Sequence, residues 1–240
     1  RTSIENVNSL KYLFLPIVVL IAPVLLVATQ PDLGTSILIA AGGLVVAWLA
    51  GVRVKFFTIS GLVFLALLPI AISFLKPYQK SRILTFLNPE RDPLGAGYQI
   101  IQSKIAIGSG GLFGKGFLQG SQSYLDYLPE KHTDFIFTLF SEEFGFFGSL
   151  FILLLYAVIV WRIIRIGNIT RSTFGKLYCY SFATAFFIYV VVNMMMVLGL
   201  LPIVGSPLPI MSYGGSSMMA MMLGLGIVMS CKVYKDTPVN

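Results

Sequence analysis

Acidic side chains gather where the polar middle of the chain gives way to a long apolar segment. Asp134 lies at that boundary, and Glu142 and Glu143 follow it. A carboxylate at such a boundary can accept a proton as a general base or help to hold a hard cation. The position also suits a helix N-cap, with Asp134 or Thr133 accepting hydrogen bonds from free amides. The residues alone leave both interpretations open.

Glu142 stands eight positions beyond Asp134, on the same helix face and about 12 Å further along. Ionisable groups at membrane depth are costly and usually face a protein interior or a watery cavity. We therefore expect Glu142 and Glu143 to face a polar cleft, unless they reach back to water at the interface. Asp32 poses a related choice, between capping the helix that follows it and supporting a site.

Other kinds of active site find little support. His132 is the only histidine, and a lone histidine more often makes a structural hydrogen bond than does chemistry. There is no Gly-x-Ser-x-Gly elbow, and Cys179 and Cys231 fall in apolar stretches typical of small buried residues. No cofactor is required, and any metal would be a hard cation such as Mg²⁺ or Mn²⁺, held by carboxylates and phosphate.

The segment 108–116 is rich in glycine and carries Lys115. It departs from the phosphate-binding Walker pattern, because Ser109 stands where the first glycine belongs and Gly116 replaces the Ser or Thr after the lysine. Glycine still lets backbone amides approach an anion, and the lysine adds positive charge. The segment is therefore either an anion contact or a flexible turn.

The elements that position these residues are membrane helices. The chain is 56% hydrophobic and 11% charged, whereas a soluble domain carries about 25% charged residues. Stretches without Asp, Glu, Lys or Arg occupy residues 12–31, 33–52, 56–75, 144–161 and 177–231. A helix needs roughly 20 apolar residues to cross the hydrocarbon, and lipid offers no partner to a bare amide. We predict an all-α polytopic protein with spans near 12–29, 34–51, 56–75, 137–161, 178–198 and 211–230.

These spans would form one membrane domain over residues 1–240, with a long loop at 76–136 that carries the site. Loops of such length are usually functional, and residues 98–106 are amphipathic enough for a short helix on the membrane surface. The connection 199–216, rich in Pro and Gly, resembles the irregular backbone that lines cavities at membrane depth.

Lys and Arg favour the cytoplasmic side of short loops. With six crossings, three basic groups fall on one side of the membrane. They are Arg53 with Lys55, then Arg162, Arg165, Arg171 and Lys176, and finally Lys232 with Lys235. That side is predicted to be the cytoplasm, with a cytoplasmic C-terminus and an extracytoplasmic long loop. The basic residues are scattered and mostly flank spans, which argues against nucleic-acid binding.

Several motifs together resemble the SEDS family (shape, elongation, division and sporulation) of cell-wall polymerases. They lie at residues 30–36, 92–98, 102–111, 128–137, 142–145 and 207–216. Residues 205–209 and 226–230 look more like the RodA branch, which serves elongation, than the FtsW branch, which serves division. The family has ten spans, so this sequence, which starts at Arg1, resembles the last six and is expected to lack its natural beginning.

The resemblance implies a peptidoglycan glycosyltransferase of the bacterial cytoplasmic (inner) membrane that polymerises lipid II during rod-shape elongation. Its partners would be a class B penicillin-binding protein, other elongation-machinery membrane proteins and membrane lipid. The acid that matches Asp134 is the essential catalytic residue of the family, and Asp126 matches a position where relatives often carry Glu.

The chemistry of that reaction suits the residues. The 4-hydroxyl of one lipid II attacks the anomeric carbon of a second chain's end, and undecaprenyl pyrophosphate leaves. Because pyrophosphate is a good leaving group, one base and several cations suffice, and a single displacement inverts the sugar carbon. We expect Asp134 as base, with cations near the diphosphate from Lys104, Lys115, Arg82 or Lys131. Supporting residues would be Asp126, Glu130, His132, Thr133, Asp32, Glu142, Glu143, Ser212 and Tyr213.

Two other functions remain open. A lipid II flippase would also use broken helices and charges in the membrane, but it should bury ionisable residues through the full depth of its helix bundle. A non-catalytic scaffold of the elongation machinery would leave Asp134 dispensable.

Overall fold

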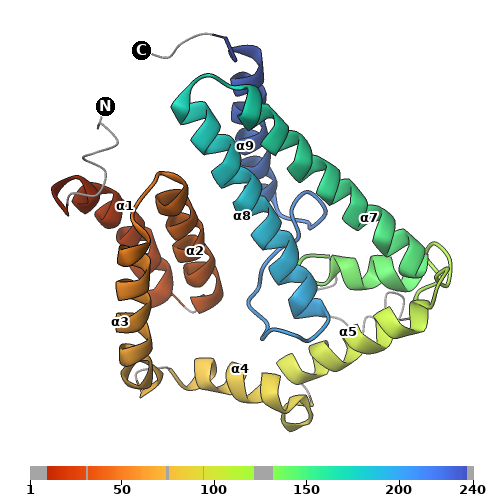
Figure 1. Cartoon of the computed structure of the whole chain (residues 1–240). Coiled ribbons are helices and arrows are strands. Elements are labelled where there is room, and N and C mark those ends of the chain that lie inside the picture. The colour runs from red at the N-terminus through yellow and green to blue at the C-terminus, as the bar shows by residue number, and fades with distance from the viewer. Residues whose placement is uncertain (1–9, 31, 74–75, 94, 122–131, 237–240) are drawn as a thin grey trace. The chain divides into compact units, whose positions relative to one another are not determined.

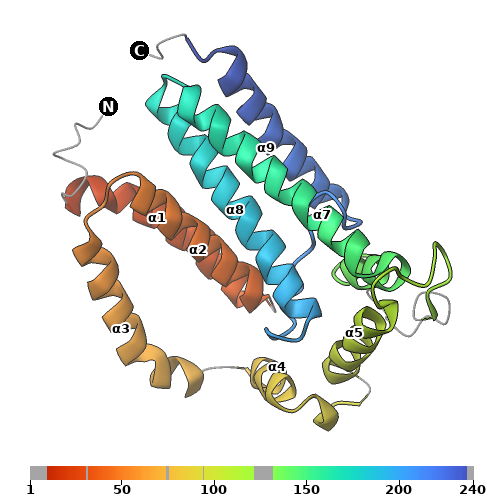
Figure 2. The same ribbon diagram turned by 45° about the vertical axis from the view of Figure 1, so that its right-hand side comes forward.

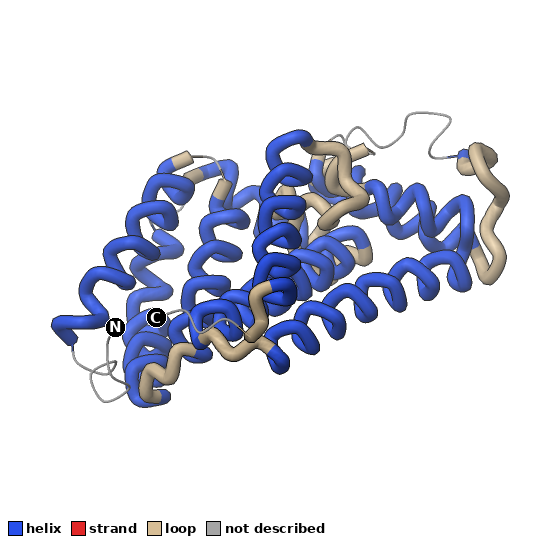
Figure 3. The backbone as a smooth tube through the Cα atoms, turned by 90° about the horizontal axis from the view of Figure 1, so that it is seen from above, coloured by secondary structure: helices blue, strands red, loops and turns tan. Residues whose placement is uncertain are grey.

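The computed structural model describes residues 10–30, 32–73, 76–93, 95–121 and 132–236, and every regular element within these ranges is a helix (Figure 3). The helices are α1 (Leu10–Thr29), α2 (Leu33–Leu49), α3 (Val54–Ser73), α4 (Pro77–Leu87), the 3-10 helix η2 (Pro89–Arg91), α5 (Ala96–Gly110), α7 (Ile136–Ile169), α8 (Thr173–Val197) and α9 (Gly215–Val233). The predicted all-α class is confirmed. The short helix expected within the long loop is α5, whereas α4 was not predicted.

Each predicted span overlaps one helix, although the number of crossings stays a prediction. Among the described residues, α7, α8 and α9 are long and apolar enough to cross a membrane. The helices α1, α2 and α3 contribute shorter apolar stretches, Leu13–Thr29, Leu33–Leu49 and Val54–Leu67. A 17-residue helix such as α2 extends about 26 Å, slightly less than the roughly 30 Å of hydrocarbon. A bilayer accommodates such a mismatch by thinning locally.

The chain forms two compact units, of which the first covers Arg1–Ser81. In this unit α1 and α2 pack together, because Gly43 of α2 lies against the side chain of Leu20 with no room for a Cβ. The hydroxyl of Ser36 donates to the carbonyl of Val24 at 2.9 Å, which ties the two helices together near the turn that joins them.

The second unit covers Arg82–Asn240. Its helices α7 and α8 run antiparallel and α9 packs against both (Figures 1 and 2). One hydrophobic core lies towards the start of α7 and comprises Phe135, Phe137, Tyr156, Phe186, Val190, Met196, Val197 and Leu208. A second core lies towards the other end of the three helices and comprises Ile163, Cys179, Ala183 and Val228. Cys179 is buried there, and Cys231 packs at its edge.

A break near the start of α7 divides the helix into a short and a long segment, and Figure 1 shows the bend between them. Gly145 has φ of 65° and ψ of −160° at this point, a backbone conformation that favours glycine. The break separates the amides of Phe146 and Phe147 from the carbonyls that they would meet in a continuous helix. These amides instead donate to the carbonyls of Gly111 and Leu112, at 2.9 and 3.2 Å.

The carbonyls on the other side of the break are satisfied by the same glycine-rich segment. The amides of Lys115 and Gly116 donate to the carbonyls of Glu142 and Glu143, each at 3.0 Å. Four backbone hydrogen bonds thus join the glycine-rich segment to α7, and a further role as an anion contact stays a prediction.

Candidate active site

Asp134 lies in the turn that leads into α7. The helix begins at Ile136, and its N-cap position is occupied by Phe135, which makes no side-chain cap. Neither Thr133 nor Asp134 is therefore the N-cap residue. The ring of Phe135 is only 1% exposed and belongs to the hydrophobic core, so it anchors Asp134 beside that core.

Three successive backbone carbonyls around Asp134 accept hydrogen bonds from the last part of the chain. The bonds run from Tyr213 N to His132 O at 2.9 Å, from Ser212 Oγ to Thr133 O at 2.6 Å and from Asn193 Nδ2 to Asp134 O at 2.8 Å. The carbonyls are thus held in place by α8 and by the connection between α8 and α9. A backbone held at three consecutive positions fixes the direction in which the Asp134 side chain leaves it.

Asn193 was missed in the sequence analysis. Its side chain is fully buried, and its amide nitrogen also donates to the carbonyl of Ser206 at 2.7 Å. A buried carboxamide joins helices and loops within a membrane protein because lipid offers no other partner. The signal was present in the sequence, since Asn193 is the only Asn or Gln in the uncharged run 177–231.

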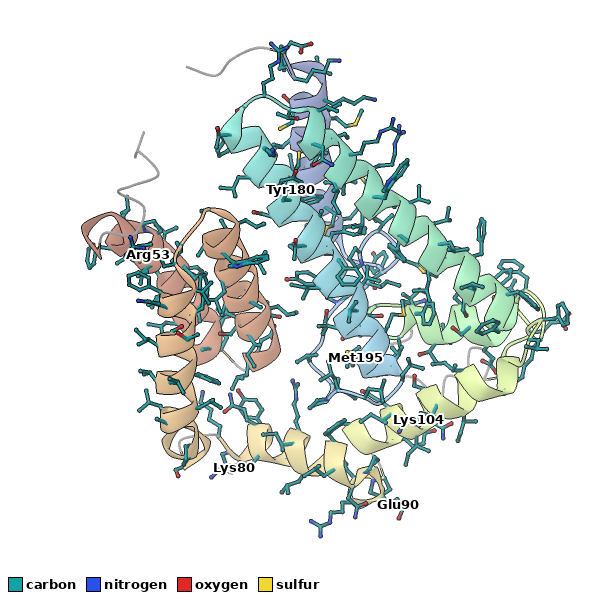
Figure 4. All side chains as sticks on the ribbon, in the orientation of Figure 1. Arg53, Lys80, Glu90, Lys104, Tyr180 and Met195 are labelled. Carbon is teal, nitrogen blue, oxygen red and sulfur yellow. The ribbon has the colours of Figure 1, made fainter. Side chains whose placement is uncertain are left out.

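Two of the predicted cations contact the connection between α8 and α9. The side chain of Lys104, on α5, lies against Gly199, and a Cβ there would come within 2.8 Å of Nζ. Figure 4 shows Lys104 at the same end of the unit as Met195 near the end of α8. The Arg82 guanidinium donates to the carbonyl of Ile203 at 3.4 Å.

The Asp134 carboxylate lies against the same connection. A Cβ added to Gly205 would stand 3.7 Å from Asp134 Oδ2. Residues 199–205 are therefore contacted by Lys104, Arg82 and Asp134. An acid and two cations thus contact one irregular segment of backbone.

A cavity of about 640 Å³ opens beside this acid. Its lining is mostly apolar, and it is formed by the turn before α7 and by the connection into α9. The lining residues are His132, Ile136, Ile210, Met211, Ser212, Tyr213, Gly214, Gly215 and Met218. Ser212 and Tyr213 also hold the backbone next to Asp134, so hydrogen bonds join the wall of this cavity to the turn that carries the acid.

Lys115, Glu142 and Glu143 form a separate group at the break in α7. The Glu142 side chain is fully buried, and Oε1 lies 2.6 Å from Lys115 Nζ. The hydroxyl of Ser121, a residue that sequence analysis missed, donates to the same oxygen at 2.9 Å. Breaking a fully buried ion pair costs about 3–5 kcal/mol, and this pair should contribute less because the Lys115 side chain is 30% exposed. The pair still fastens the glycine-rich segment to α7. A role for Lys115 at the diphosphate stays a prediction.

The remaining predicted site residues lie elsewhere. Asp32 belongs to the first unit and caps α2, because its carboxylate accepts from Thr35 N at 3.0 Å and from Thr35 Oγ1 at 2.6 Å. Its role at the site is a prediction. Asp126, Glu130 and Lys131 lie outside the described residues.

The part of the chain that the structure describes contains no preformed metal site. No group of three or more His, Cys, Asp or Glu side chains comes together there. A hard cation would need the phosphate oxygens of a substrate to complete its ligands. A divalent cation therefore stays a prediction, and no step of the chemistry below depends on it.

Comparison with known proteins identifies the relatives of this chain. Residues 2–237 match the cell cycle protein family of FtsW, RodA and SpoVE. The chain belongs to this family. The SEDS resemblance seen in the motifs is thereby confirmed, and with it the polytopic α-helical class.

Members of the family are similar along nearly the whole chain. The peptidoglycan glycosyltransferase MrdB of Escherichia coli K12 is 49% identical over 228 residues, which cover 95% of this chain and 62% of MrdB. The peptidoglycan glycosyltransferase RodA of Treponema pallidum is 47% identical over 156 residues, which cover 65% of this chain and 36% of that protein. The chain thus spans about three fifths of the length of MrdB.

Solved structures share the fold. A chain of a peptidoglycan synthase complex, described as coordinating polymerization and crosslinking, is 32% identical with a TM-score of 0.75, covering 96% of this chain and 64% of that one. RodA of Thermus thermophilus, a rod-shape-determining protein, is 26% identical with a TM-score of 0.62, covering 98% of this chain and 62% of its own.

Proposed function

We propose that this chain carries the active site of a peptidoglycan glycosyltransferase that polymerises lipid II into glycan strands. The observation that carries the proposal is the arrangement of Asp134, whose backbone is held by Asn193, Ser212 and Tyr213. Similarity to MrdB, a peptidoglycan glycosyltransferase, along 95% of the chain supports the same activity.

The proposed reaction is a single displacement. Asp134 takes the proton from the 4-hydroxyl of one lipid II as that oxygen attacks the anomeric carbon of the other substrate. The bond from this carbon to the diphosphate oxygen breaks, and undecaprenyl diphosphate leaves with the electron pair. The attack comes from the face opposite the leaving group, so the sugar carbon is inverted.

Cations and an apolar cavity serve the leaving group in this proposal. Lys104 and Arg82, which contact residues 199–203, would neutralise the charge that develops on the diphosphate. The mostly apolar cavity beside His132 would hold the first isoprene units of a polyprenyl chain. Thr133, whose carbonyl accepts from Ser212, would help to orient the base.

The partner and the membrane follow from the relatives. We propose that the protein works in the bacterial inner membrane, with residues 76–136 outside the cytoplasm, beside a class B penicillin-binding protein that crosslinks the strands. The structural similarity to a chain of a peptidoglycan synthase complex supports such a partner.

The placement of charge favours this enzyme over a flippase. A flippase should carry ionisable side chains through the depth of its helix bundle. The sequence of α8 has one ionic residue, Lys176 in its first turn, and that of α9 has one, Lys232 in its last turn. In α7, Glu142 and Glu143 lie near the start of the helix. Charge thus gathers at the ends of these helices, which supports chemistry at the membrane surface.

Polymerisation of labelled lipid II by the full-length protein, with its penicillin-binding partner, tests the proposal. Asp134→Asn keeps the shape of the side chain and removes its basicity, so we expect wild type to make polymer and the variant to lose activity by at least about a hundredfold. Glu90→Gln is the matched control, because Glu90 is an exposed acid of η2 that the proposed site does not use.

Each result has a distinct meaning. Polymer from wild type and Glu90→Gln alone supports both the enzyme and its base. Polymer from Asp134→Asn at the wild-type rate would move the base to Asp126, Glu130 or Glu142. No polymer from any variant, where a known polymerase succeeds, would favour the flippase.

A further inference from the structure

A basic cavity lies at the end of the second unit where α7 and α9 finish. It has a volume of about 280 Å³ and is lined by Arg162, Arg165, Ile166, Ile169 and Lys232. The α7 residues follow one another at helical spacing and share one helix face. Lys232 faces them from the last turn of α9, and the two helix ends lie side by side (Figures 1 and 2).

Among the described residues, no acidic side chain lines this cavity or pairs with Arg162, Arg165 or Lys232. Asp236 is the only acidic residue after Glu143 in the sequence. Its carboxylate pairs with Arg171 at 3.8 Å and with Lys235 at 4.0 Å, and neither of these residues lines the cavity. Like charges a few residues apart repel one another, so an anion from outside the protein would stabilise this arrangement.

We expect the cavity to lie at the depth of lipid headgroups, because it is formed at the ends of two apolar helices, α7 and α9. Trp161 is 52% exposed and adjoins the cavity, with the Arg165 guanidinium 5.4 Å from the centre of its ring. Exposed tryptophan marks the interface between hydrocarbon and water. Ile166 and Ile169 give the cavity an apolar wall next to the basic wall that Arg162, Arg165 and Lys232 form. A ligand that satisfies both walls has a negative charge joined to an apolar chain.

We propose that this cavity binds the phosphate headgroup of an anionic membrane lipid. Arg162, Arg165 and Lys232 would surround the phosphate, and an arginine can offer it two parallel N–H donors. Ile166 and Ile169 would contact the first carbons of the acyl chains. Basic pockets between membrane helices bind anionic headgroups in this way, and the site is independent of the proposed catalysis.

Binding of phosphatidylglycerol to the full-length protein in detergent, measured by native mass spectrometry, tests the proposal. Phosphatidylcholine carries the same phosphate and chains with an added cation, and inorganic phosphate carries the charge without the chains. Each basic residue contributes about fivefold in affinity for an anionic surface. We therefore expect Arg162→Gln with Lys232→Gln to weaken phosphatidylglycerol binding about thirtyfold.

Lys176→Gln is the matched control. Lys176 is an exposed cation in the first turn of α8 that does not line the cavity, and we expect its loss to change binding less than about twofold, because it would act on the headgroup only through solvent, where salt screens its charge. Arg162→Lys retains the charge but loses the paired N–H donors of the guanidinium, so it should bind less tightly than wild type and more tightly than Arg162→Gln. Thermal unfolding in lipid-free detergent shows whether each variant is folded.

The outcomes separate the possible ligands. Tight phosphatidylglycerol binding that is lost only in the double variant supports the proposal. Equal affinity for phosphatidylcholine, or undiminished binding by a folded double variant, would overturn it and leave the cations a role in membrane orientation alone. Competition by inorganic phosphate at concentrations similar to the lipid would also overturn it, in favour of a free-phosphate site.

Discussion

The side chain of Asp134 owes its position to residues far away in the sequence. The turn that carries it has no regular secondary structure of its own, and its carbonyls are held by α8 and by the connection 199–216. Among these donors Asn193 is the most deeply buried, and its side chain joins the backbone of Asp134 to that of Ser206. The acid is thus positioned by a buried amide and not by its neighbours in the chain.

Replacing Asn193 with alanine should therefore disturb both folding and activity. The change leaves the carbonyls of Asp134 and Ser206 without this donor, and an unsatisfied buried polar group costs about 1–3 kcal/mol. We expect a lower unfolding temperature and, because a small misplacement of a catalytic group is costly, a loss of polymerisation of roughly tenfold or more. Thermal unfolding and the lipid II assay measure the two effects.

Thr184→Ala is the control for Asn193→Ala. Thr184 lies on the same helix, and its hydroxyl donates only to the carbonyl of Tyr180 one turn away. Its loss should leave the rate of polymerisation unchanged. Equal effects of the two substitutions would show that Asn193 has no special link to Asp134.

At the scale of the elements, the break in α7 is the feature that organises the start of this helix. Gly145 interrupts the helix, and residues 111–116 complete its hydrogen bonds from outside. The ion pair between the buried Glu142 and Lys115 lies at the same junction. The glycine-rich segment and the acids after Asp134 are thus two halves of one structure.

Gly145→Ala should damage this junction. The positive φ disfavours any side chain, and a Cβ here would collide with the backbone of Leu112 and Gly114. We expect a loss of about 1–3 kcal/mol or more in stability, as strained backbone at a non-glycine residue costs this amount. Thermal unfolding of the purified protein measures it.

Gly108→Ala serves as the comparison. Gly108 lies on α5 near the same junction, and a Cβ there meets nothing within 4 Å. Because alanine favours a helix over glycine, this substitution should be neutral or slightly stabilising. A wild-type unfolding temperature for Gly145→Ala would contradict the structural role that we give to the break.

At the scale of the whole molecule, the distribution of positive charge predicts the orientation in the membrane. The connection between α7 and α8 and the C-terminal end are basic, and we expect both in the cytoplasm. The segment that joins α5 to α7 should then lie outside. This orientation follows from charge and from an even number of crossings between the two basic regions.

Cysteine labelling in intact cells tests that orientation. In a Cys179→Ala, Cys231→Ala background, we expect a membrane-impermeant maleimide to label Gln119→Cys and to spare Lys176→Cys until the cells are opened. Both positions are exposed, so access depends on the side of the membrane and not on burial. Labelling of Lys176→Cys in intact cells would show that the orientation is the reverse of the predicted one.

Much of the fold could be predicted from the sequence because membrane helices obey local rules. The uncharged runs locate every helix from α1 to α3 and from α7 to α9, since each must satisfy its own backbone in lipid. Asp134 stands out because it is an acidic residue at the boundary between the polar loop and an apolar helix. The N-cap role of Asp32 could also be predicted as one of two alternatives, because a cap depends on residues within one turn.

What the sequence could not determine depends on contacts between distant segments. By itself it determined the helical class, the approximate positions of the apolar helices and the acid that opens the catalytic proposal. Only the tertiary structure decided that Asn193 and Ser212 hold the backbone around Asp134, and that Lys115 pairs with Glu142. Hydropathy is a property of neighbouring residues, whereas a hydrogen bond between a turn and a helix about sixty residues away exists only once the chain has packed.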